Sequence, residues 1–231
     1  MNATPLEVLL FGAAPYAALA LFFVGTIVRY RTRPFTYSSL STQFLENKRH
    51  FWAQVPFHYG VLTVLAGHLV AFLLPDAILW WNARPLRLYA LEVTGLAAAA
   101  LTLVGLVNIV VRRARHRMVR ASTSAMDWVV YALLLVQVTS GMDLAVSKTW
   151  GSSWFASVVS PYLWSLAKFS PEPDRIAALP FVFKMHVVGL WAILGVFPFT
   201  RLVHVLVVPN PYLWRRPQVA RWYGVRRQAR A

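Results

Sequence analysis

The sequence lacks cysteine altogether, although it is 231 residues long. A chain without cysteine forms no disulfide bridge, attaches no haem through a CxxCH motif, and builds no thiolate zinc site or cysteine-ligated iron–sulfur cluster. Any metal bound by this chain must therefore be held by histidine or carboxylate side chains. Acidic residues are scarce as well: eight Asp and Glu stand against 23 Lys and Arg, which gives a formal net charge of +15.

Charged residues of either sign make up only 13% of the chain, while hydrophobic types make up 58%. A typical soluble domain has about 25% charged and about 45–50% apolar residues, so this composition argues against an ordinary soluble domain. A strongly basic soluble protein would suggest a nucleic-acid partner. Here the basic residues lie between long apolar blocks, so membrane topology explains them first and we expect no nucleic-acid partner. GxSxG, HExxH, Walker and GxGxxG motifs are also missing, which leaves soluble-type catalysis and nucleotide binding without support.

Five apolar blocks are long enough to cross a hydrocarbon core of about 30 Å at about 1.5 Å per helical residue. They cover residues 6–28, 55–74, 86–111, 126–146 and 180–208. A sixth stretch, residues 150–168, is shorter and richer in Trp, Ser and Tyr, and we interpret it as an interfacial helix or a re-entrant loop. The sequence therefore predicts an all-α integral membrane protein with one transmembrane domain over residues 1–208 and a basic tail over residues 209–231.

Basic residues are distributed unevenly between the two sides of these blocks. The segments 29–54, 112–125 and 209–231 together hold 16 of the 23 Lys and Arg residues, whereas the opposite loops hold four. By the positive-inside rule, the N-terminus lies outside and the C-terminus lies in the cytoplasm of a prokaryotic cell. The tail is either a helix on the membrane surface or a docking segment for a cytoplasmic partner.

Histidines are the most informative residues inside the apolar blocks, because ionisable groups at membrane depth mark functional sites. The six histidines are His50, His58, His68, His116, His186 and His204. His50 and His116 lie in basic loops, and we interpret them as surface residues. The second and fifth blocks run in opposite directions, so His68 is level with His186 near the outer face, and His58 is level with His204 near the inner face. Two imidazoles from facing helices suit the axial ligation of a b-type haem, and we therefore expect a haem-binding helix bundle.

The spacing of these histidines poses a geometric problem. The 18 residues from His186 to His204 span about 27 Å of continuous helix, whereas the ten residues from His58 to His68 span only about 15 Å. A tilted helix, slanted ligands or a distortion at Pro198 could absorb the difference. Four glycines flank the histidines, and they provide either room for a flat macrocycle or close helix packing: Gly60, Gly67, Gly189 and Gly195.

The histidine-bearing segments resemble a known family. These segments read PFHYGVLTVLAGHLVAFLLP and FVFKMHVVGLWAILGVFPFTRLVHVLVVPNPYL, and both are similar to the gamma subunit of respiratory nitrate reductase. The N-terminal segment beginning APYAALALFFVG and the central RRARHRMVRASTSAMD extend the resemblance over nearly the whole chain. The resemblance implies a dihaem cytochrome b of anaerobic respiration, which oxidises menaquinol or ubiquinol. It pairs His68 with His186 at the outer haem b and His58 with His204 at the inner haem b.

The resemblance also implies partners and a quinol site. An iron–sulfur beta subunit and a molybdenum-containing alpha subunit, which reduces nitrate, are expected on the cytoplasmic side. The quinol site of the family lies near the outer haem, where Gly67 and His68 match its Gly–His pair. Many members carry a lysine where the third helix begins. Here Arg87 aligns best, with Arg84 as its competitor, and arginine cannot usefully donate its proton.

The remaining charged residues at membrane depth have two readings each. Three arginines either bind the propionates of the inner haem or extend their side chains to the lipid headgroups: Arg112, Arg113 and Arg201. The acids form a proton relay or are paired structural groups: Glu92, Asp127 and Asp143. The leading interpretation is a membrane anchor that passes electrons from quinol to the iron–sulfur subunit. The alternatives are a cytochrome b of a heterodisulfide-reductase-like or sulfite-reduction complex, and a haem-free transporter or scaffold in which the histidines form a proton path.

Overall fold

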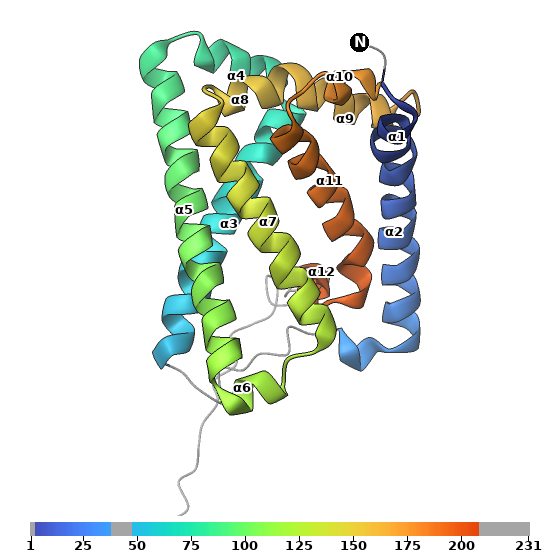
Figure 1. The fold of residues 1–231 in the computed structure, drawn as a ribbon, viewed down its shortest axis with the longest axis vertical. Helices are drawn as coiled ribbons and strands as arrows, with labels where there is room; N and C mark the ends of the chain where they lie inside the picture. The colour runs from blue at the N-terminus through green and yellow to red at the C-terminus, as the bar shows by residue number, and fades with distance from the viewer. Residues whose placement is uncertain (1–2, 38–47, 208–231) are drawn as a thin grey trace, which may run out of the picture.

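The computed structural model describes residues 3–37 and 48–207, and every regular element in these ranges is a helix (Figure 1). Five helical segments are long and apolar enough to cross a membrane: Pro5–Thr32, Phe51–Leu73, Pro85–Arg115, Ala125–Ser147 and Phe181–Phe199. The prediction of an all-α protein with five candidate transmembrane helices is therefore confirmed. The predicted basic tail lies outside the described residues.

The first span begins with a capping box. It consists of α1 (Pro5–Val8), a π-helical turn (Leu9–Ala13) and α2 (Ala14–Thr32). The Thr4 side chain accepts a hydrogen bond from the Glu7 backbone N–H, while the Glu7 carboxylate accepts one from the Thr4 N–H. Two free N–H groups of the helix start are satisfied in this way. Glu7 also accepts a hydrogen bond from Lys184 Nζ at 2.6 Å, which ties α1 to the fifth span.

The helices of the bundle pack in two groups. The second span, α3 (Lys48–Leu73), packs along α5 (Pro85–Arg115), while α11 (Phe181–Val196) packs against α2 and α7 (Ala125–Ser147). The contact between α3 and α5 depends on glycine. A Cβ at Gly60 would lie 2.6 Å from the Ala98 carbonyl oxygen, and a Cβ at Gly105 would lie 2.4 Å from the Phe57 nitrogen. Gly60 therefore serves close helix packing, which is one of the two readings of the glycines.

Short helices form a layer across one end of the bundle, here called the α4 end (Figure 1). They are α4 (Pro75–Asn82), α8 (Gly151–Trp154), α9 (Ser160–Ala167) and α10 (Asp174–Ala177). The sixth apolar stretch is thus helical, as the interfacial-helix interpretation requires, and it joins α8 to α9 through a π-helical turn. Tyr162 of α9 is completely buried and donates to the Phe11 carbonyl at 2.8 Å, which fixes this layer to the first span. Burial also raises the pKa of the Tyr162 hydroxyl.

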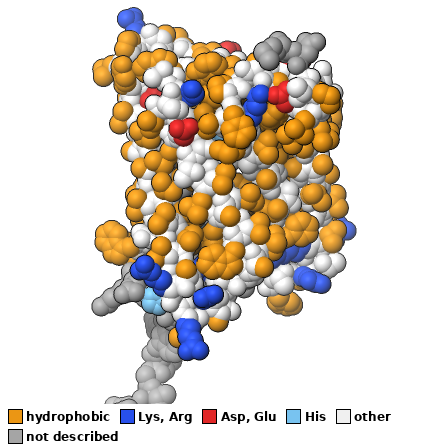
Figure 2. Space-filling view, in the orientation of Figure 1, with side chains coloured by type: hydrophobic (Ala, Val, Ile, Leu, Met, Phe, Trp, Pro, Cys, Tyr) orange, Lys and Arg blue, Asp and Glu red, His pale blue; other side chains and the backbone are white. Residues whose placement is uncertain are grey.

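The opposite end carries the short helix α6 (Arg117–Ala121) and is here called the α6 end. Figure 2 shows apolar side chains around the middle of the bundle and most of the visible Lys and Arg side chains towards the α6 end. Many large apolar residues of the middle are at least half exposed, among them Leu62, Leu65 and Val104. Such a belt suits contact with lipid tails. The expected assignment of the α6 end to the cytoplasm remains a prediction.

The fifth span is shorter than predicted, because the helix breaks. The helix α11 ends at Val196, a 3₁₀ turn covers Phe197–Phe199, and Thr200 is extended, with ψ at 177°. A second 3₁₀ turn, Arg201–Val203, leads into α12 (His204–Val207). Proline lacks a backbone N–H and its ring clashes with the preceding turn, so Pro198 explains the break. The fifth span over residues 180–208 is therefore not one continuous helix, and of the three ways to reconcile the histidine spacing the structure shows the distortion at Pro198.

Candidate cofactor site

The four intramembrane histidines meet as two pairs. The ring centres of His68 on α3 and His186 on α11 lie 6.4 Å apart, with 32° between the ring planes. The ring centres of His58 on α3 and His204 on α12 also lie 6.4 Å apart, with 70° between the planes. A metal ion bound from opposite sides by two imidazole nitrogens, at about 2.0–2.1 Å each as in zinc proteins, holds the ring centres roughly 6 Å apart. Both pairs therefore have the spacing of two axial ligands.

Backbone carbonyls orient three of the four rings. The Nδ1 atom of His58 lies 2.8 Å from the Gln54 carbonyl oxygen, and that of His68 lies 2.8 Å from the Val64 oxygen. The Nδ1 atom of His204 lies 2.6 Å from the oxygen of Arg201. A carbonyl only accepts, so each Nδ1 carries the proton and each Nε2 keeps a lone pair. This arrangement is typical of metal-binding histidines.

His186 is held differently, by two polar side chains of α7. Its Nδ1 lies 2.9 Å from Ser140 Oγ, and its Nε2 lies 3.2 Å from the amide nitrogen of Gln137. The Ser140 hydroxyl donates its proton to the backbone carbonyl oxygen of Gln137 at 3.1 Å, so its oxygen accepts the hydrogen bond from Nδ1 of His186. The Gln137 amide then donates to Nε2. Iron can reach this nitrogen only if the Gln137 side chain turns away.

The sequence interpretation missed Gln137 and Ser140. The signal was available, because both are polar residues inside an apolar block of 21 residues. The Gln137 Oε1 atom is buried and finds no hydrogen-bond partner in the described part of the chain. A Cβ at Gly189 would lie 2.2 Å from this oxygen, and a Cβ at Gly141 would lie 2.9 Å from His186 Cε1. Both glycines therefore give room to the His186 network.

The surface of α3 is open on the two sides of His68, where it continues the apolar belt that includes Leu65. A Cβ at Gly67 would meet no atom within 4 Å, and Leu65 and Leu69 are 58% and 56% exposed. The described residues also form no group of three or more His, Asp or Glu that could hold a bare metal ion. Two imidazoles at the spacing of axial ligands fit a planar macrocycle that brings its own four equatorial ligands. The residues present therefore fit haem.

The predicted propionate partners lie at the α6 end. Arg201 forms a two-pronged ion pair with Asp127, with Nε 2.5 Å from Oδ1 and Nη2 in contact with Oδ2. Asp127 also accepts a hydrogen bond from the Ser124 backbone N–H at 2.8 Å, so it caps α7 as well. Asp127 is thus a paired, structural acid, and two of the N–H donors of Arg201 are occupied by it. Asp143, on the same helix, is exposed.

Arg112 and Arg113 are both buried at the end of α5. Arg113 donates to Thr123 Oγ1 at 2.9 Å, and its guanidinium carbon lies 5.6 Å from the ring centre of Tyr131. Its Nε atom has no hydrogen-bond partner among the described residues.

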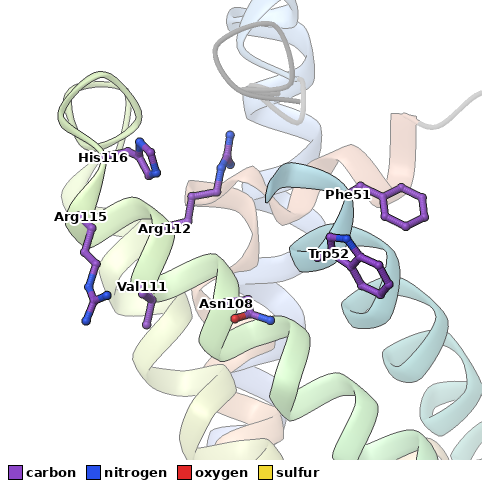
Figure 3. Close-up of a pocket in the computed structure, with 7 residues that line it drawn as sticks. All are labelled: Phe51, Trp52, Asn108, Val111, Arg112, Arg115 and His116. Carbon is purple, nitrogen blue, oxygen red and sulfur yellow. The ribbon is translucent and has the colours of Figure 1, made fainter. Parts of the chain in front are cut away.

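An open hollow of about 590 Å³ lies between the start of α3 and the end of α5 (Figure 3). Its lining is aromatic on the α3 side and largely polar and basic on the α5 side: Phe51, Trp52, Asn108, Val111, Arg112, Arg115 and His116. His116, interpreted from the sequence as an ordinary surface residue, therefore belongs to a basic depression at the α6 end.

Arg87 lies in the first turn of α5, at the α4 end. Its guanidinium carbon is 4.4 Å from the ring centre of Trp80 and 5.4 Å from that of Trp81. It donates to the Trp80 carbonyl at 2.9 Å, and the Trp81 indole N–H donates to the Arg87 carbonyl at 2.9 Å. These contacts tie α5 to α4. The buried Arg87 Nε has no partner in the part of the chain that the structure describes. Arg84, its competitor, is the residue that precedes α5.

Glu92 caps a short helix. It accepts hydrogen bonds from the Ser152 backbone N–H at 2.9 Å and from the Ser152 hydroxyl at 2.7 Å, at the start of α8. The Asn82 amide donates to the hydroxyls of Ser152 and Ser153, which extends this network to α4. Of the two readings of Glu92, the structural one accounts for these contacts.

Comparison with known proteins places this geometry in a wider context. A family model described as "Nitrate reductase gamma subunit" matches residues 7–223. The chain is 30% identical over 210 residues to the nitrate reductase gamma chain of Bacillus subtilis, an alignment that covers 90% of this chain and 94% of that protein. It is 29% identical over 221 residues to the respiratory nitrate reductase 2 gamma chain of Escherichia coli, with 94% and 97% covered. The respiratory nitrate reductase 1 gamma chain of the same bacterium is 30% identical over 229 residues, with 94% and 97% covered.

Proposed function

The chain belongs to the nitrate reductase gamma subunit family, and from this premise we propose that it is the subunit through which a respiratory nitrate reductase takes electrons from quinol. It is a multi-pass protein of the prokaryotic cytoplasmic membrane. Quinol oxidation belongs to this chain, and nitrate reduction belongs to a partner subunit. Menaquinol and ubiquinol both fit the chemistry of the proposal.

The observation that carries the proposal is the pairing of four imidazoles across the bundle. Each pair has the ring-centre separation that two axial ligands require. We infer that His68 and His186 hold a haem b at the α4 end, and that His58 and His204 hold a second one nearer the α6 end. Haem b in such sites supplies one-electron redox chemistry. The chain contributes the ligands and fixes the tautomers of His58, His68 and His204 through backbone carbonyls.

The quinol site of the proposal lies beside His68 at the α4 end. Gly67 leaves open space there, and the nearby start of α5 brings Arg87 to the same end of the bundle. The guanidinium of Arg87, which lies over the Trp80 ring, offers N–H donors that can bind a quinol oxygen or a haem propionate. Arginine keeps its proton at neutral pH, so Arg87 orients the quinol and water accepts the protons.

In this proposal, the α6 end of the bundle faces the cytoplasm and the partner subunits. Many of the basic residues of the described chain gather there, which agrees with the positive-inside rule (Figure 2). Electrons leave at this end to an iron–sulfur beta subunit, which passes them to a molybdenum-containing alpha subunit. Arg112 and Arg113 lie at the same end as the pair of His58 and His204, where buried cations can neutralise propionates.

The proposal is tested on the whole complex purified from membranes. We expect a b-type visible spectrum with two haems per copy of this chain, reduced by a quinol and reoxidised by nitrate. His68→Ala and His186→Ala should each remove the same haem, while His58→Ala and His204→Ala remove the other. A complex whose reduced spectrum lacks the absorption bands of b-type haem, or a loss that groups His58 with His186, contradicts the proposal.

A further inference from the structure

The break in the fifth span solves the spacing problem of the histidines. A continuous helix would separate His186 from His204 by about 27 Å, whereas α3 separates its own two histidines by about 15 Å. Both pairs nevertheless have the same ring-centre distance of 6.4 Å. The chain achieves this because it turns between Val196 and His204, so the second ligand leaves the axis of α11 (Figure 1).

A break inside a membrane helix frees backbone carbonyls, which need donors because lipid offers none. Arg29 of α2 provides them. Its Nη1 donates to the carbonyl oxygens of Pro198 and Thr200, at 2.7 and 2.8 Å. The rest of its guanidinium holds Thr36, with 2.7 Å from Nη2 to the carbonyl oxygen and 3.2 Å from Nε to Oγ1. One arginine thus fixes both sides of the break to α2.

A glycine one turn earlier makes this approach possible. A Cβ at Gly25 would lie 2.9 Å from Pro198 Cβ, so any larger residue would push α2 away from the break. Thr200 closes the break locally: its hydroxyl donates to the Phe197 carbonyl at 2.8 Å and accepts from the Leu202 N–H at 3.1 Å. The segment between α11 and α12 is therefore a defined structure, shaped by its contact with α2.

The other side of the segment is fixed to α7. The Arg201 side chain is paired with Asp127, while the Arg201 carbonyl oxygen accepts the hydrogen bond of His204 Nδ1 at 2.6 Å. The residue that anchors the segment is thus also the residue that orients the imidazole. Any movement of Arg201 away from α7 moves the acceptor of the His204 ring.

We propose that Arg29 and Asp127 are positioning residues for His204, because together they clamp the broken segment 197–204 between α2 and α7. Within the described residues, the hydrogen bonds of Arg29 go to Pro198, Thr200 and Thr36, and those of Asp127 go to Arg201 and Ser124, so the imidazole is reached only indirectly. Their effect reaches it through the carbonyls of Pro198 and Thr200 and through Arg201. This inference rests on the proposed function, since it concerns how firmly and in which geometry the pair of His58 and His204 holds the inner haem, and it concerns no other site.

The test uses Arg29→Gln and Asp127→Asn in the complete membrane complex, with Arg31→Gln as the matched control. Arg31 lies two residues further along α2 and is exposed. The measurements are haem content, the low-temperature spectrum of each haem and the midpoint potential of each haem. Outer-shell partners of metal-binding histidines change affinity about 10- to 100-fold. We therefore expect loss of inner haem, or a shifted spectrum and potential of the inner haem, with the outer haem at its wild-type content.

Arg29→Lys provides the rescue. A lysine ammonium can donate to the two carbonyls but cannot also hold Thr36 with a planar fork, so the inner haem should return in part. Unchanged content, spectrum and potential of the inner haem in both test variants overturns the clamp. Loss of both haems together also overturns it, because that result shows a general collapse. A wild-type complex without a second haem instead refutes the proposed function, which keeps the two failures distinct.

Discussion

The amide nitrogen of Gln137 lies 3.2 Å from Nε2 of His186, the atom that would face iron. The same imidazole is held on its other side by Ser140, 2.9 Å from Nδ1. One neighbour therefore occupies the ligand position, while the other fixes the tautomer that ligation requires. The two α7 side chains should have opposite effects on the outer haem.

Replacement of Gln137 by leucine should strengthen outer-haem binding. The Gln137 amide must leave Nε2 before iron can bind, and a net hydrogen bond is worth about 0.5–1.5 kcal/mol, which corresponds to a roughly two- to ten-fold change in affinity. Haem retention during detergent washing, followed by the outer-haem spectrum, measures this effect. Thr139→Val, at an exposed position of the same helix, is the control.

Replacement of Ser140 by alanine should weaken the same site. The Nδ1 proton of His186 loses its acceptor, and loss of an outer partner of a metal-binding histidine costs about 10- to 100-fold in affinity. The inner haem should stay at its wild-type content, because His58 and His204 use backbone carbonyls. Equal retention of the outer haem in the Ser140→Ala and wild-type complexes would show that the serine has no such role.

Removal of Arg87 should slow quinol oxidation without loss of either haem. A hydrogen bond to a charged group is worth about 1.5–3 kcal/mol, so Arg87→Ala should reduce the rate of quinol-driven haem reduction by about ten-fold or more. Electron transfer from an artificial donor to nitrate should survive. Arg84→Ala is the matched comparison, because Arg84 lies just before the same helix. Unchanged quinol kinetics in Arg87→Ala would show that the guanidinium does not bind quinol and serves only to hold α4 against α5 through Trp80.

Glu92 should matter for stability and little for turnover. Glu92→Gln keeps an oxygen that accepts from the Ser152 N–H, so quinol oxidation should remain close to the wild-type rate. Glu92→Ala removes the cap of α8 and should cost about 0.5–2 kcal/mol of stability, seen as a lower Tm of the complex. A large rate loss in Glu92→Gln with an unchanged Tm would instead identify a proton relay.

The absence of cysteine permits a clean test of orientation. In intact cells, a membrane-impermeant maleimide should label Lys168→Cys at the α4 end but should leave Arg115→Cys at the α6 end unlabelled. Permeabilised cells should label Arg115→Cys as well, since this residue is exposed in the described structure. The reverse pattern would invert the topology and place the partner subunits on the other side.

Much of the architecture follows from the lengths and the order of the apolar blocks in the sequence. The lengths of the apolar blocks predict five spans, and the structure confirms five candidate spans. The antiparallel order of the blocks pairs the histidines as the structure places them. The break after Val196 was only one of several ways to reconcile the spacing, because a proline does not reveal which neighbours will hold the freed carbonyls. Arg29 is 169 residues before Pro198, and no local pattern connects them.

The charged residues were harder to predict for the same reason. From the sequence, Arg201 and Arg87 each suited either a cofactor or quinol contact or snorkelling to the headgroups. Asp127 and Glu92 each suited either a proton relay or a paired structural role. Their actual partners come from other helices: Asp127 lies 74 residues before Arg201, and Glu92 lies 60 residues before Ser152. Only the packing of the bundle decides between such readings. Gln137 and Ser140 show the converse, because their polarity inside an apolar block was visible from the beginning.

The glycine contact between α3 and α5 has a mechanical consequence for the two histidine pairs. Gly60 and Gly105 bring the two backbones into contact, so α3 and α5 form one closely packed unit that carries both His58 and His68. The opposite ligands lie on two separate helices, α11 and α12, because the chain is broken between His186 and His204. His186 is held by Ser140 and Gln137. The position of His204 depends on the contacts of its segment with α2 and α7. Substitutions on one side of the bundle can therefore tune one electron-carrying centre at a time, whereas a tilt of the α3–α5 unit detunes both.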